Sequence, residues 1–249
     1  SLGIVLKDRG EIDAAIACFK QAIKIKPNHH QAIHVLASLS GETTNFAPRD
    51  YVEKLFDSFA SKFEYSLTEK LDYQAPRIIT EMIIKRHPSK ALGSILDLGC
   101  GTGLVGLEIK RFCQNLEGID LSKPMLEQAR GKGFYDKLIH CDITEHLIEA
   151  NLDFDYFISA DVFIYLGDLS DVFRLIKSRN NRRGKLVFST EHTEREGFYL
   201  EKSGRYSHSL NYIKSLCTKY DYHLSHFEKT NLRKEKSEFL IGGLYLLDF

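Results

Sequence analysis

The chain has 249 residues, and its 34 Lys and Arg residues balance 34 Asp and Glu residues, so its formal charge is zero. With 43% hydrophobic and 27% charged residues, the composition is that of a globular protein and excludes a disordered chain. The zero balance leaves no surplus of cations for phosphate contacts, so a nucleic-acid partner is not expected. No run of about 18 uncharged apolar residues occurs, so no membrane span is expected either.

Five cysteines are spread along the chain, and no two of them form a C-x-x-C pair. The odd count and the spacing argue against a disulfide framework and a zinc ribbon, and they suit a reducing compartment. Because no secretory signal pattern is present either, a cytoplasmic location is expected. His29, His30 and His34 lie close together, but no neighbouring carboxylate or cysteine completes a metal site. We expect them to lie in a turn and on an exposed helix face, with no metal bound.

Residues 1–40 are expected to be helical and to carry part of a tetratricopeptide repeat, whose pattern is W-x2-L-G-x2-Y, then A-x3-F, then P. Gly3 and Ala15 are small enough to let two helices approach, with Phe19 and Leu6 between them. The Trp position would precede Ser1, so the chain is expected to be a piece of a longer protein. The segment is either a partner-docking arm or a stub that packs on the main domain. The matching residues are Leu2, Gly3, Leu6, Ala15, Phe19 and Pro27.

Residues 41–90 are expected to form a helical cap. A polar break over 41–48 is followed by helical periodicity over 51–66 and over 74–86, and Pro88 prevents the second helix from continuing. The segment is rich in aromatic residues, which serve either as core or as a lid beside a cofactor. Tyr65 is counted among the residues expected near that cofactor. The aromatic residues are Tyr51, Phe56, Phe59, Phe63, Tyr65 and Tyr73.

A glycine-rich turn follows the first strand, which is expected over 94–98. Gly99, Gly101 and Gly103 permit a sharp turn and a close approach of a ligand to the backbone. A helix follows, and a second strand over 116–119 ends in Asp120, an acid suited to ribose hydroxyls. This is the nucleotide-binding half of a doubly wound sheet.

The chemistry of Asp97 distinguishes two cofactor classes. Gly101, Gly103 and Gly106 satisfy G-x-G-x-x-G, which also occurs in dinucleotide-binding proteins. Asp97, however, puts a carboxylate at the mouth of the first strand, where it would repel a pyrophosphate. S-adenosylmethionine (SAM) has no phosphate and carries two cationic groups, a sulfonium and an ammonium, so an acid there favours SAM.

Three further strands are expected to end in acids at the same edge of the sheet, where ligands of open α/β sheets gather. Between the second and third strands, Ser122 is expected to cap a helix with Pro124 in its first turn. Two strand-like segments at 222–230 and 239–248 can form a hairpin at the sheet edge. The three strands are expected over 138–142, 154–159 and 184–190, ending at Asp142, Asp161 and Glu191.

With these features, residues 90–249 resemble the class I SAM-dependent methyltransferases. The resemblance rests on the D-L-G-C-G-T-G run at 97–103, the G-I-D-L-S run at 118–122 and the acid at Asp142. It implies an α/β, Rossmann-like fold with a seven-stranded, mostly parallel sheet and a C-terminal antiparallel hairpin, here with a helical N-terminal extension. Segments 51–63, 161–169 and 204–212 are also similar to bacterial tetratricopeptide-repeat-containing methyltransferases.

The resemblance implies a set of SAM-binding residues. Asp97 would face the ammonium and Asp120 the ribose hydroxyls, while Ala160 and Asp161 would lie near the transferred methyl group. Cys100 lies within the loop at a helix N-terminus, which is expected to lower its thiol pKa, although a catalytic cysteine is not expected there. The remaining expected contacts are Gly99, Cys100, Gly101 and Gly103 to the methionine part, Leu121 and Met125 to the adenine, and Asp142 and Ile143 to its amino group.

For the acceptor end, the candidate catalytic residues are Arg205, Tyr206 and His208. Arg205 is expected to pair with a substrate carboxylate, or with Asp161 or Glu191. Next to His208, Ser207 or Ser209 could simply cap a helix over 210–220. Further candidates in the loops after strands are Tyr165, Glu191 and His192.

Taken together, the sequence predicts partial repeat helices over 1–40, a helical cap or lid over 41–90 and a SAM-binding methyltransferase domain over 91–249. The expected activity is methyl transfer from SAM to a small-molecule acceptor, with S-adenosylhomocysteine (SAH) as product. Two alternatives remain open. One is a protein methyltransferase that docks its substrate on the repeat helices, and the other is a SAM-binding interaction protein without catalysis.

Overall fold

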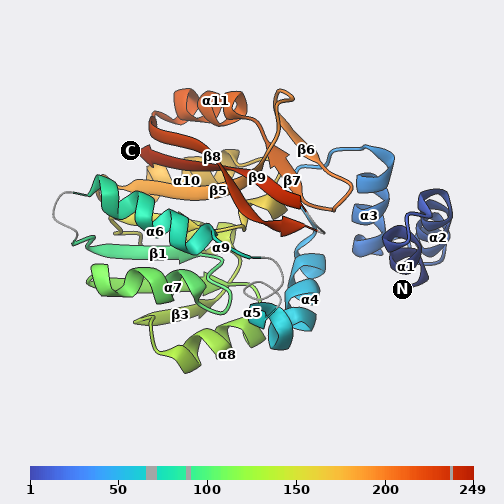
Figure 1. Ribbon diagram of the computed structural model, residues 1–249, viewed down its shortest axis with the longest axis horizontal. Coiled ribbons are helices and arrows are strands. Elements are labelled where there is room, and N and C mark those ends of the chain that lie inside the picture. Colours follow the sequence, from blue (N-terminus) through green and yellow to red (C-terminus); the bar gives the residue numbers. More distant parts are fainter. Residues whose placement is uncertain (66–71, 88–90, 236–237) are drawn as a thin grey trace.

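The computed structural model describes residues 1–65, 72–87, 91–235 and 238–249, and Figure 1 shows them arranged around one mixed sheet. Five parallel strands run in the order β3-β2-β1-β4-β5, and β9 and β8 continue the sheet as an antiparallel hairpin beside β5. The expected Rossmann-like, mostly parallel α/β fold is confirmed. The strands are β1 (Ser94–Leu98), β2 (Asn115–Asp120), β3 (Lys137–His140), β4 (Tyr156–Ser159), β5 (Lys185–His192), β8 (His223–Glu235) and β9 (Glu238–Asp248).

A second hairpin corrects the expected number of strands. In the described residues the sheet has nine strands where seven are expected, because β6 (Phe198–Leu200) and β7 (Tyr206–His208) add to it. β7 runs parallel to the end of β5, with Glu191 opposite Ser207 and His192 opposite His208. The segment that was expected to be an acceptor loop therefore contains a strand of the sheet.

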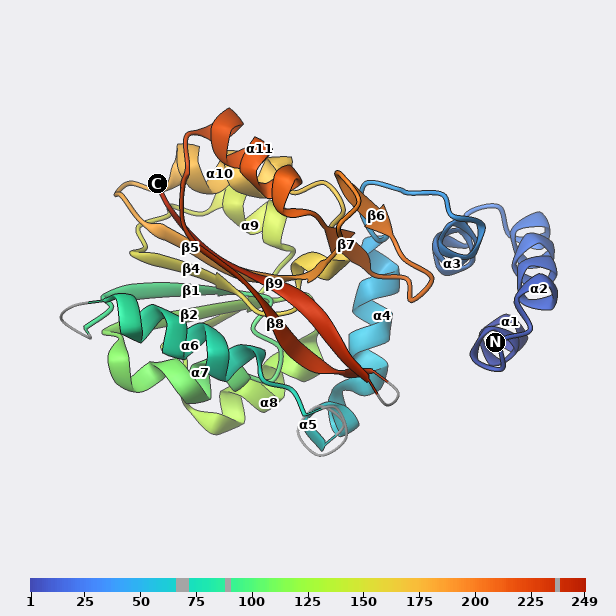
Figure 2. The same cartoon turned by 45° about the horizontal axis from the view of Figure 1, so that its top comes forward.

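Helices cover both faces of the sheet, as Figure 2 shows. Strand periodicity divides the side chains: Ile95 of β1 packs toward α6 and α7, while Leu96 and Leu98 pack toward α9, α10 and α11. Asp97 alternates with Leu96 and Leu98, so it shares the α7 face with Ile95. The helices are α6 (Ala75–Arg86), α7 (Leu104–Ile109), α8 (Lys123–Lys132), α9 (Ile143–Glu149), α10 (Ser170–Arg179) and α11 (Leu210–Tyr220), with one-turn 3-10 helices at Lys110–Phe112 and Phe163–Tyr165.

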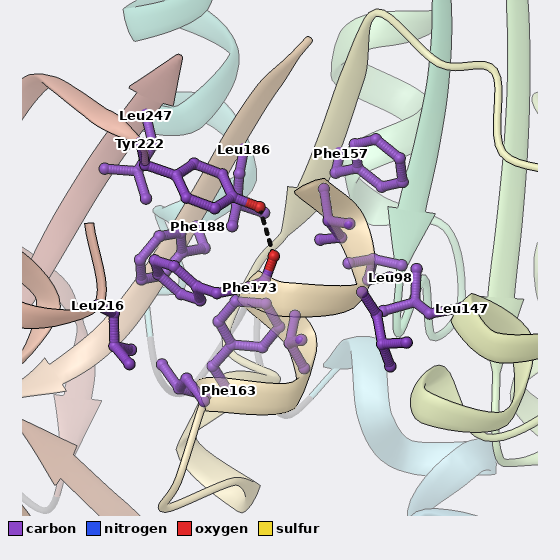
Figure 3. Close-up of a cluster of buried hydrophobic side chains, with 14 of the residues drawn as sticks. Leu98, Leu147, Phe157, Phe163, Phe173, Leu186, Phe188, Leu216, Tyr222 and Leu247 are labelled. Carbon is purple, nitrogen blue, oxygen red and sulfur yellow. Dashed lines mark hydrogen bonds between the residues drawn. The ribbon is translucent and has the colours of Figure 1, made fainter. Parts of the chain in front are cut away.

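The larger core lies between the sheet and α10 and α11 (Figure 3). It is aromatic: the rings of Phe188 and Tyr245 stack with centroids 4.9 Å apart. Its Tyr222 hydroxyl donates to the carbonyl of Phe173 at 2.8 Å. Large fully buried side chains of this kind supply most of the free energy that holds the strands in register.

Three helices project from one end of the molecule, and α3 is the one nearest the sheet (Figures 1 and 2). As expected, α1 and α2 approach closely, since a Cβ at Gly3 would lie 2.9 Å from the Phe19 ring. His34 was expected on an exposed face but is 1% exposed, and its Nε2 bonds to the carbonyl of Gly204 at 2.9 Å. The helices are α1 (Leu2–Asp8), α2 (Ile12–Ile25) and α3 (His30–Ser40).

The following segment crosses the carboxyl ends of the strands (Figure 1). It consists of α4 (Arg49–Phe59), a 3-10 turn (Ala60–Lys62) and α5 (Phe63–Tyr65), so the expected helix over 51–66 is present in broken form. Its expected last residue, 66, and the proline at 88 lie outside the described residues. Among the helices that the structure describes, none is long and apolar enough to cross a membrane.

Candidate cofactor and acceptor site

The glycine turn after β1 has the sharp geometry that the sequence predicts. Gly99, Gly101 and Gly103 have φ angles of +77°, +54° and +90°, which side chains with a Cβ rarely adopt. The amides of Gly99 and Cys100 both donate to the carbonyl of Ile119 at 2.9 Å, which ties the turn to β2. A Cβ at Gly101 would meet only the Phe63 ring, at 3.8 Å, so the backbone of Gly101 remains approachable by a ligand.

Asp120 holds this turn from the end of β2. Its Oδ2 accepts from the Gly101 amide and its Oδ1 from the Ser122 amide, both at 2.8 Å. Burial raises the pKa of Asp120, and these two backbone hydrogen bonds oppose that rise. A carboxylate oxygen accepts more than one hydrogen bond, so Asp120 retains capacity for a pair of hydroxyls.

Asp97 is fully buried beneath the turn. Its Oδ2 accepts a hydrogen bond from the Tyr135 hydroxyl at 2.6 Å, whereas its Oδ1 has no partner among the residues that the structure describes. Burial raises the pKa of Asp97 to about 7; the Tyr135 bond lowers it, and the charge of Asp120 raises it. An unpaired buried carboxylate oxygen is unfavourable unless a donor or cation meets it. Asp97 therefore fits the ammonium group of SAM.

The pKa of Cys100 contradicts the sequence-based expectation. Burial raises this thiol pKa well above its ordinary value, and the nearby carboxylates of Asp97 and Asp120 raise it further. The expected lowering by a helix N-terminus fails because α7 begins only at Leu104. Cys100 is 6% exposed, so it acts as a packed part of the turn.

The predicted adenine-side residues lie at the starts of α8 and α9. Ser122 caps α8 as expected, accepting from the Met125 amide at 3.4 Å, and the Met125 side chain is fully buried. Leu121 and Ile143 are half-buried. Asp142 also caps a helix, α9, through bonds from the amides of Thr144 (2.8 Å) and Glu145 (3.2 Å). This second role was missed, although Asp142 followed by Glu145 is the spacing of a capping box.

Residues 49–65 are fastened over this end of the sheet, mainly to α8. Asp57 accepts a hydrogen bond from the Ser122 hydroxyl at 2.6 Å, and the Gln128 amide group donates to the carbonyl of Ala60 at 2.6 Å. Glu64 forms an ion pair with Lys132 of α8. No sequence pattern indicates these contacts, because they join residues 65 to 68 positions apart.

Aromatic side chains on the same segment face the site. Phe63 stands over Gly101, and Phe56 packs edge-on against both Phe63 and Tyr165, with centroids 6.0 and 5.3 Å apart. Tyr65, predicted near the cofactor, is 62% exposed. The segment thus places a hydrophobic cover above the turn.

A network of ion pairs lies where β4 and β5 end, at the side of the site that is expected to receive the acceptor. Arg233 of β8 pairs with Asp161 after β4, and its Nη2 lies 2.7 Å from Oε1 of Glu191 at the end of β5. Arg205 pairs with Glu191 too, one of the partners that the sequence predicts for it. Asp161 also accepts from the Ser189 hydroxyl at 3.0 Å. Two carboxylates and two guanidinium groups make this wall electrically balanced.

Two of the three predicted catalytic residues are buried away from solvent. Tyr206 is fully buried, with its hydroxyl 2.6 Å from the Thr44 hydroxyl. His208 is fully buried, and its Nε2 bonds to the carbonyl of Gly167 at 2.9 Å. Burial lowers the His208 pKa to about 4, so it is neutral at pH 7. This geometry favours a packing role for both. Ser209, as expected, caps α11.

Residues 95–184 match a family model described as a methyltransferase domain. The chain is 32% identical over 127 residues to human methyltransferase-like protein 27, covering 49% of each. It therefore spans about half the length of this curated relative.

Two solved structures share the fold. Magnesium protoporphyrin IX methyltransferase of Synechocystis, with bound SAM, covers 80% of this chain and 96% of its own, with 16% identity and a TM-score of 0.59. The 1,6-didemethyltoxoflavin N1-methyltransferase of Burkholderia thailandensis, with bound substrate and SAH, covers 81% and 90%, with 15% identity and a TM-score of 0.61.

The family match identifies a methyltransferase domain over residues 95–184, and the fold around it is that of solved SAM-dependent methyltransferases. The two solved structures hold SAM and SAH, the cofactor and the product of such enzymes.

Because Asp97 is buried, its charge is expected to lower the stability of the ligand-free protein. The pKa of Asp97 is raised in the folded protein, so the fold loses stability as pH rises from about 4 to about 7. Asn does not titrate. Asp97→Asn should therefore make the ligand-free protein more stable at pH 8, by on the order of 4 kcal/mol, with the gain vanishing near pH 4. Urea unfolding at both pH values measures this, and a gain equal at both would contradict it.

The ion network predicts a large cost for removing its central cation. Arg233→Met leaves Asp161 with a buried, uncompensated charge, while Glu191 keeps its pair with Arg205, and this loss costs about 3–5 kcal/mol. As a control, Arg182→Met removes an exposed pair with Asp153 and should cost far less. Denaturant unfolding of both variants at pH 7 measures the difference. Equal costs would mean that the network does not stabilise the fold.

Proposed function

We propose that this protein transfers a methyl group from SAM to a small-molecule acceptor. One observation carries the proposal: within the described part of the chain, an oxygen of the buried Asp97 has no partner, and it lies beneath a turn whose Gly101 backbone is open to a ligand. A cationic, phosphate-free nucleoside satisfies both features. A dinucleotide would bring its pyrophosphate toward the carboxylates of Asp97 and Asp120.

In this proposal the chain contributes binding, orientation and exclusion of water. Asp97 meets the ammonium group, Asp120 the ribose hydroxyls and the glycine turn the methionine part. When bound, SAM supplies an activated methyl group for an in-line displacement, so orientation of the acceptor accounts for most of the catalysis. Within the cap or lid that is predicted over residues 41–90, residues 49–65 are proposed to keep water out, and the cover by Phe56 and Phe63 supports this role.

The acceptor is proposed to enter between this cover and the ion network of Asp161, Glu191, Arg205 and Arg233. Arg205 is retained as a contact to the acceptor, while the predicted roles of Tyr206 and His208 in catalysis find no support in their burial. No general base is assigned, since a base is needed only if the acceptor must lose a proton. By their names, the two enzymes whose solved structures are similar methylate magnesium protoporphyrin IX and 1,6-didemethyltoxoflavin, which supports a small acceptor.

Residues 1–40 are proposed to be a partial tetratricopeptide repeat that docks a partner protein. The contact of Gly3 with Phe19 and the shared core of Ala15, Phe19 and Val35 support this interpretation. We also propose a cytoplasmic location, in keeping with five unpaired cysteines.

Cofactor binding is the direct test of this proposal. The wild-type protein should bind SAM and SAH in isothermal titration. Asp120→Ala should weaken both by roughly a hundredfold, because it removes charged hydrogen bonds to the ribose and frees the Gly101 amide. Asp171→Ala, which removes an exposed carboxylate on α10, is the control and should bind normally. If the wild type binds neither molecule, the proposed function is wrong.

Removal of α1 and α2 separates a small-molecule acceptor from a protein acceptor. The deletion should stop before α3, because His34 of that helix bonds to Gly204 of the main body. With radiolabelled SAM, methylation of small molecules should persist at the wild-type rate in the chain lacking residues 1–28. Labelling confined to a protein, and lost on deletion, would instead favour a protein methyltransferase. Cofactor binding without any labelled product would favour a non-catalytic interaction protein.

A further inference from the structure

Tyr135, in the loop between α8 and β3, has no role in the function described so far. Its ring fills the space beside Gly103, Gly106 and Gly118, where an added Cβ would lie 3.0, 2.7 and 2.8 Å from ring atoms. Gly106 has no positive φ, so its backbone would accept a side chain. All three nearest atoms to a Cβ at Gly106 belong to Tyr135. Gly106, the last glycine of G-x-G-x-x-G, is thus explained by the tyrosine ring and not by a phosphate.

The hydroxyl of Tyr135 has a fixed direction. It accepts from the Gly106 amide at 3.2 Å, an amide in the first turn of α7 that has no partner within the helix. It donates its own proton to Oδ2 of Asp97 at 2.6 Å. The result is a chain of hydrogen bonds from amide to hydroxyl to carboxylate. This chain occupies one oxygen of Asp97 and leaves Oδ1 unpartnered.

We propose that Tyr135 is the positioning residue for the cofactor's ammonium group. By donating to Oδ2, it keeps the Asp97 carboxylate ionised and turned so that Oδ1 faces the methionine part of SAM. This inference rests on the proposed function, and it adds to that function a residue that sets the pH range of cofactor binding.

The surroundings of Asp97 make this hydrogen bond necessary. Among the described residues, the titratable groups that face Asp97 are Tyr135 from the loop, Asp120 from β2, Cys100 from the turn and Tyr73 from the segment before α6. None of these four is a cation. Burial and Asp120 both raise the Asp97 pKa, and the Tyr135 hydrogen bond opposes them. Without that bond, less of the carboxylate would be ionised at pH 7.

Tyr135→Phe tests the inference, because it keeps the ring beside the glycines and removes only the hydroxyl. Dissociation constants for SAH are measured by isothermal titration from pH 6 to pH 9 in both proteins. The ratio of variant to wild type should be about tenfold at pH 6 and fall toward one at pH 9, where both carboxylates are ionised. The amino group of SAH titrates in both experiments, so its effect cancels in the ratio.

Two controls isolate the hydroxyl and the ring. Tyr199→Phe removes a tyrosine hydroxyl on β6, bonded to the carbonyl of Glu196, and should leave SAH affinity unchanged. Gly106→Ala should displace the ring and weaken binding, whereas Gly131→Ala in α8, where an added Cβ meets nothing within 4 Å, should not. Carboxyl ¹³C NMR of the ligand-free proteins should give a higher Asp97 pKa in Tyr135→Phe than in the wild type.

Each outcome has one meaning. A ratio that falls with pH, together with a raised Asp97 pKa, supports the inference. A ratio of one throughout, or a loss of affinity that is the same at every pH, overturns it while leaving the proposed function intact, since the wild type still binds. If the wild type does not bind SAH, the proposed function itself fails.

Discussion

The structure depends on carboxylates buried at the carboxyl ends of parallel strands. Asp97 is the residue before the last of β1, Asp120 ends β2, and Asp161 follows β4, and at this edge the sheet leaves backbone amides and side chains free to bind a ligand. Removing these groups from water is unfavourable, so each needs hydrogen bonds or a counter-charge. The fold supplies these for Asp120, through two amides, and for Asp161, through Arg233 and Ser189. Within the described residues, Asp97 accepts a hydrogen bond on Oδ2 but has no partner for Oδ1.

This uneven compensation explains how structure and binding are related. A site that satisfied every carboxylate would be more stable, but nothing in it would select a cation. The ion network at the acceptor end shows the opposite arrangement, in which Arg205 and Arg233 balance Asp161 and Glu191 without a ligand. In the described structure one oxygen of Asp97 therefore lacks a partner, while the charges of the ion network pair with one another.

The sequence predicted the features that depend on neighbouring residues. Local spacing predicts the strand that contains Asp97, the glycine turn, the cap at Ser122 and the helix over 210–220 with a serine cap. The structure contains all of these features, and the serine that caps the last helix is Ser209. The errors concern contacts between distant segments. The burial of His208 depends on Gly167 and the rings of Phe198 and Tyr212, and no local pattern indicates that β7 pairs with β5. The pKa of Cys100 was wrong because a local rule about helix ends ignored two carboxylates and burial.

The hairpin of β6 and β7 connects parts of the molecule that otherwise lie apart. On one side it receives His34 and Thr44 through Gly204 and Tyr206. On the other it carries Arg205 and joins the last residues of β5 beside Glu191. The helical extension therefore rests on the element that forms the acceptor wall, with the sheet behind it. A displacement of α3 would therefore be felt at Arg205 through the hairpin, while the backbone bonds of Asn45 and Ala47 to residues 165–168 hold the same end of the molecule by a second route.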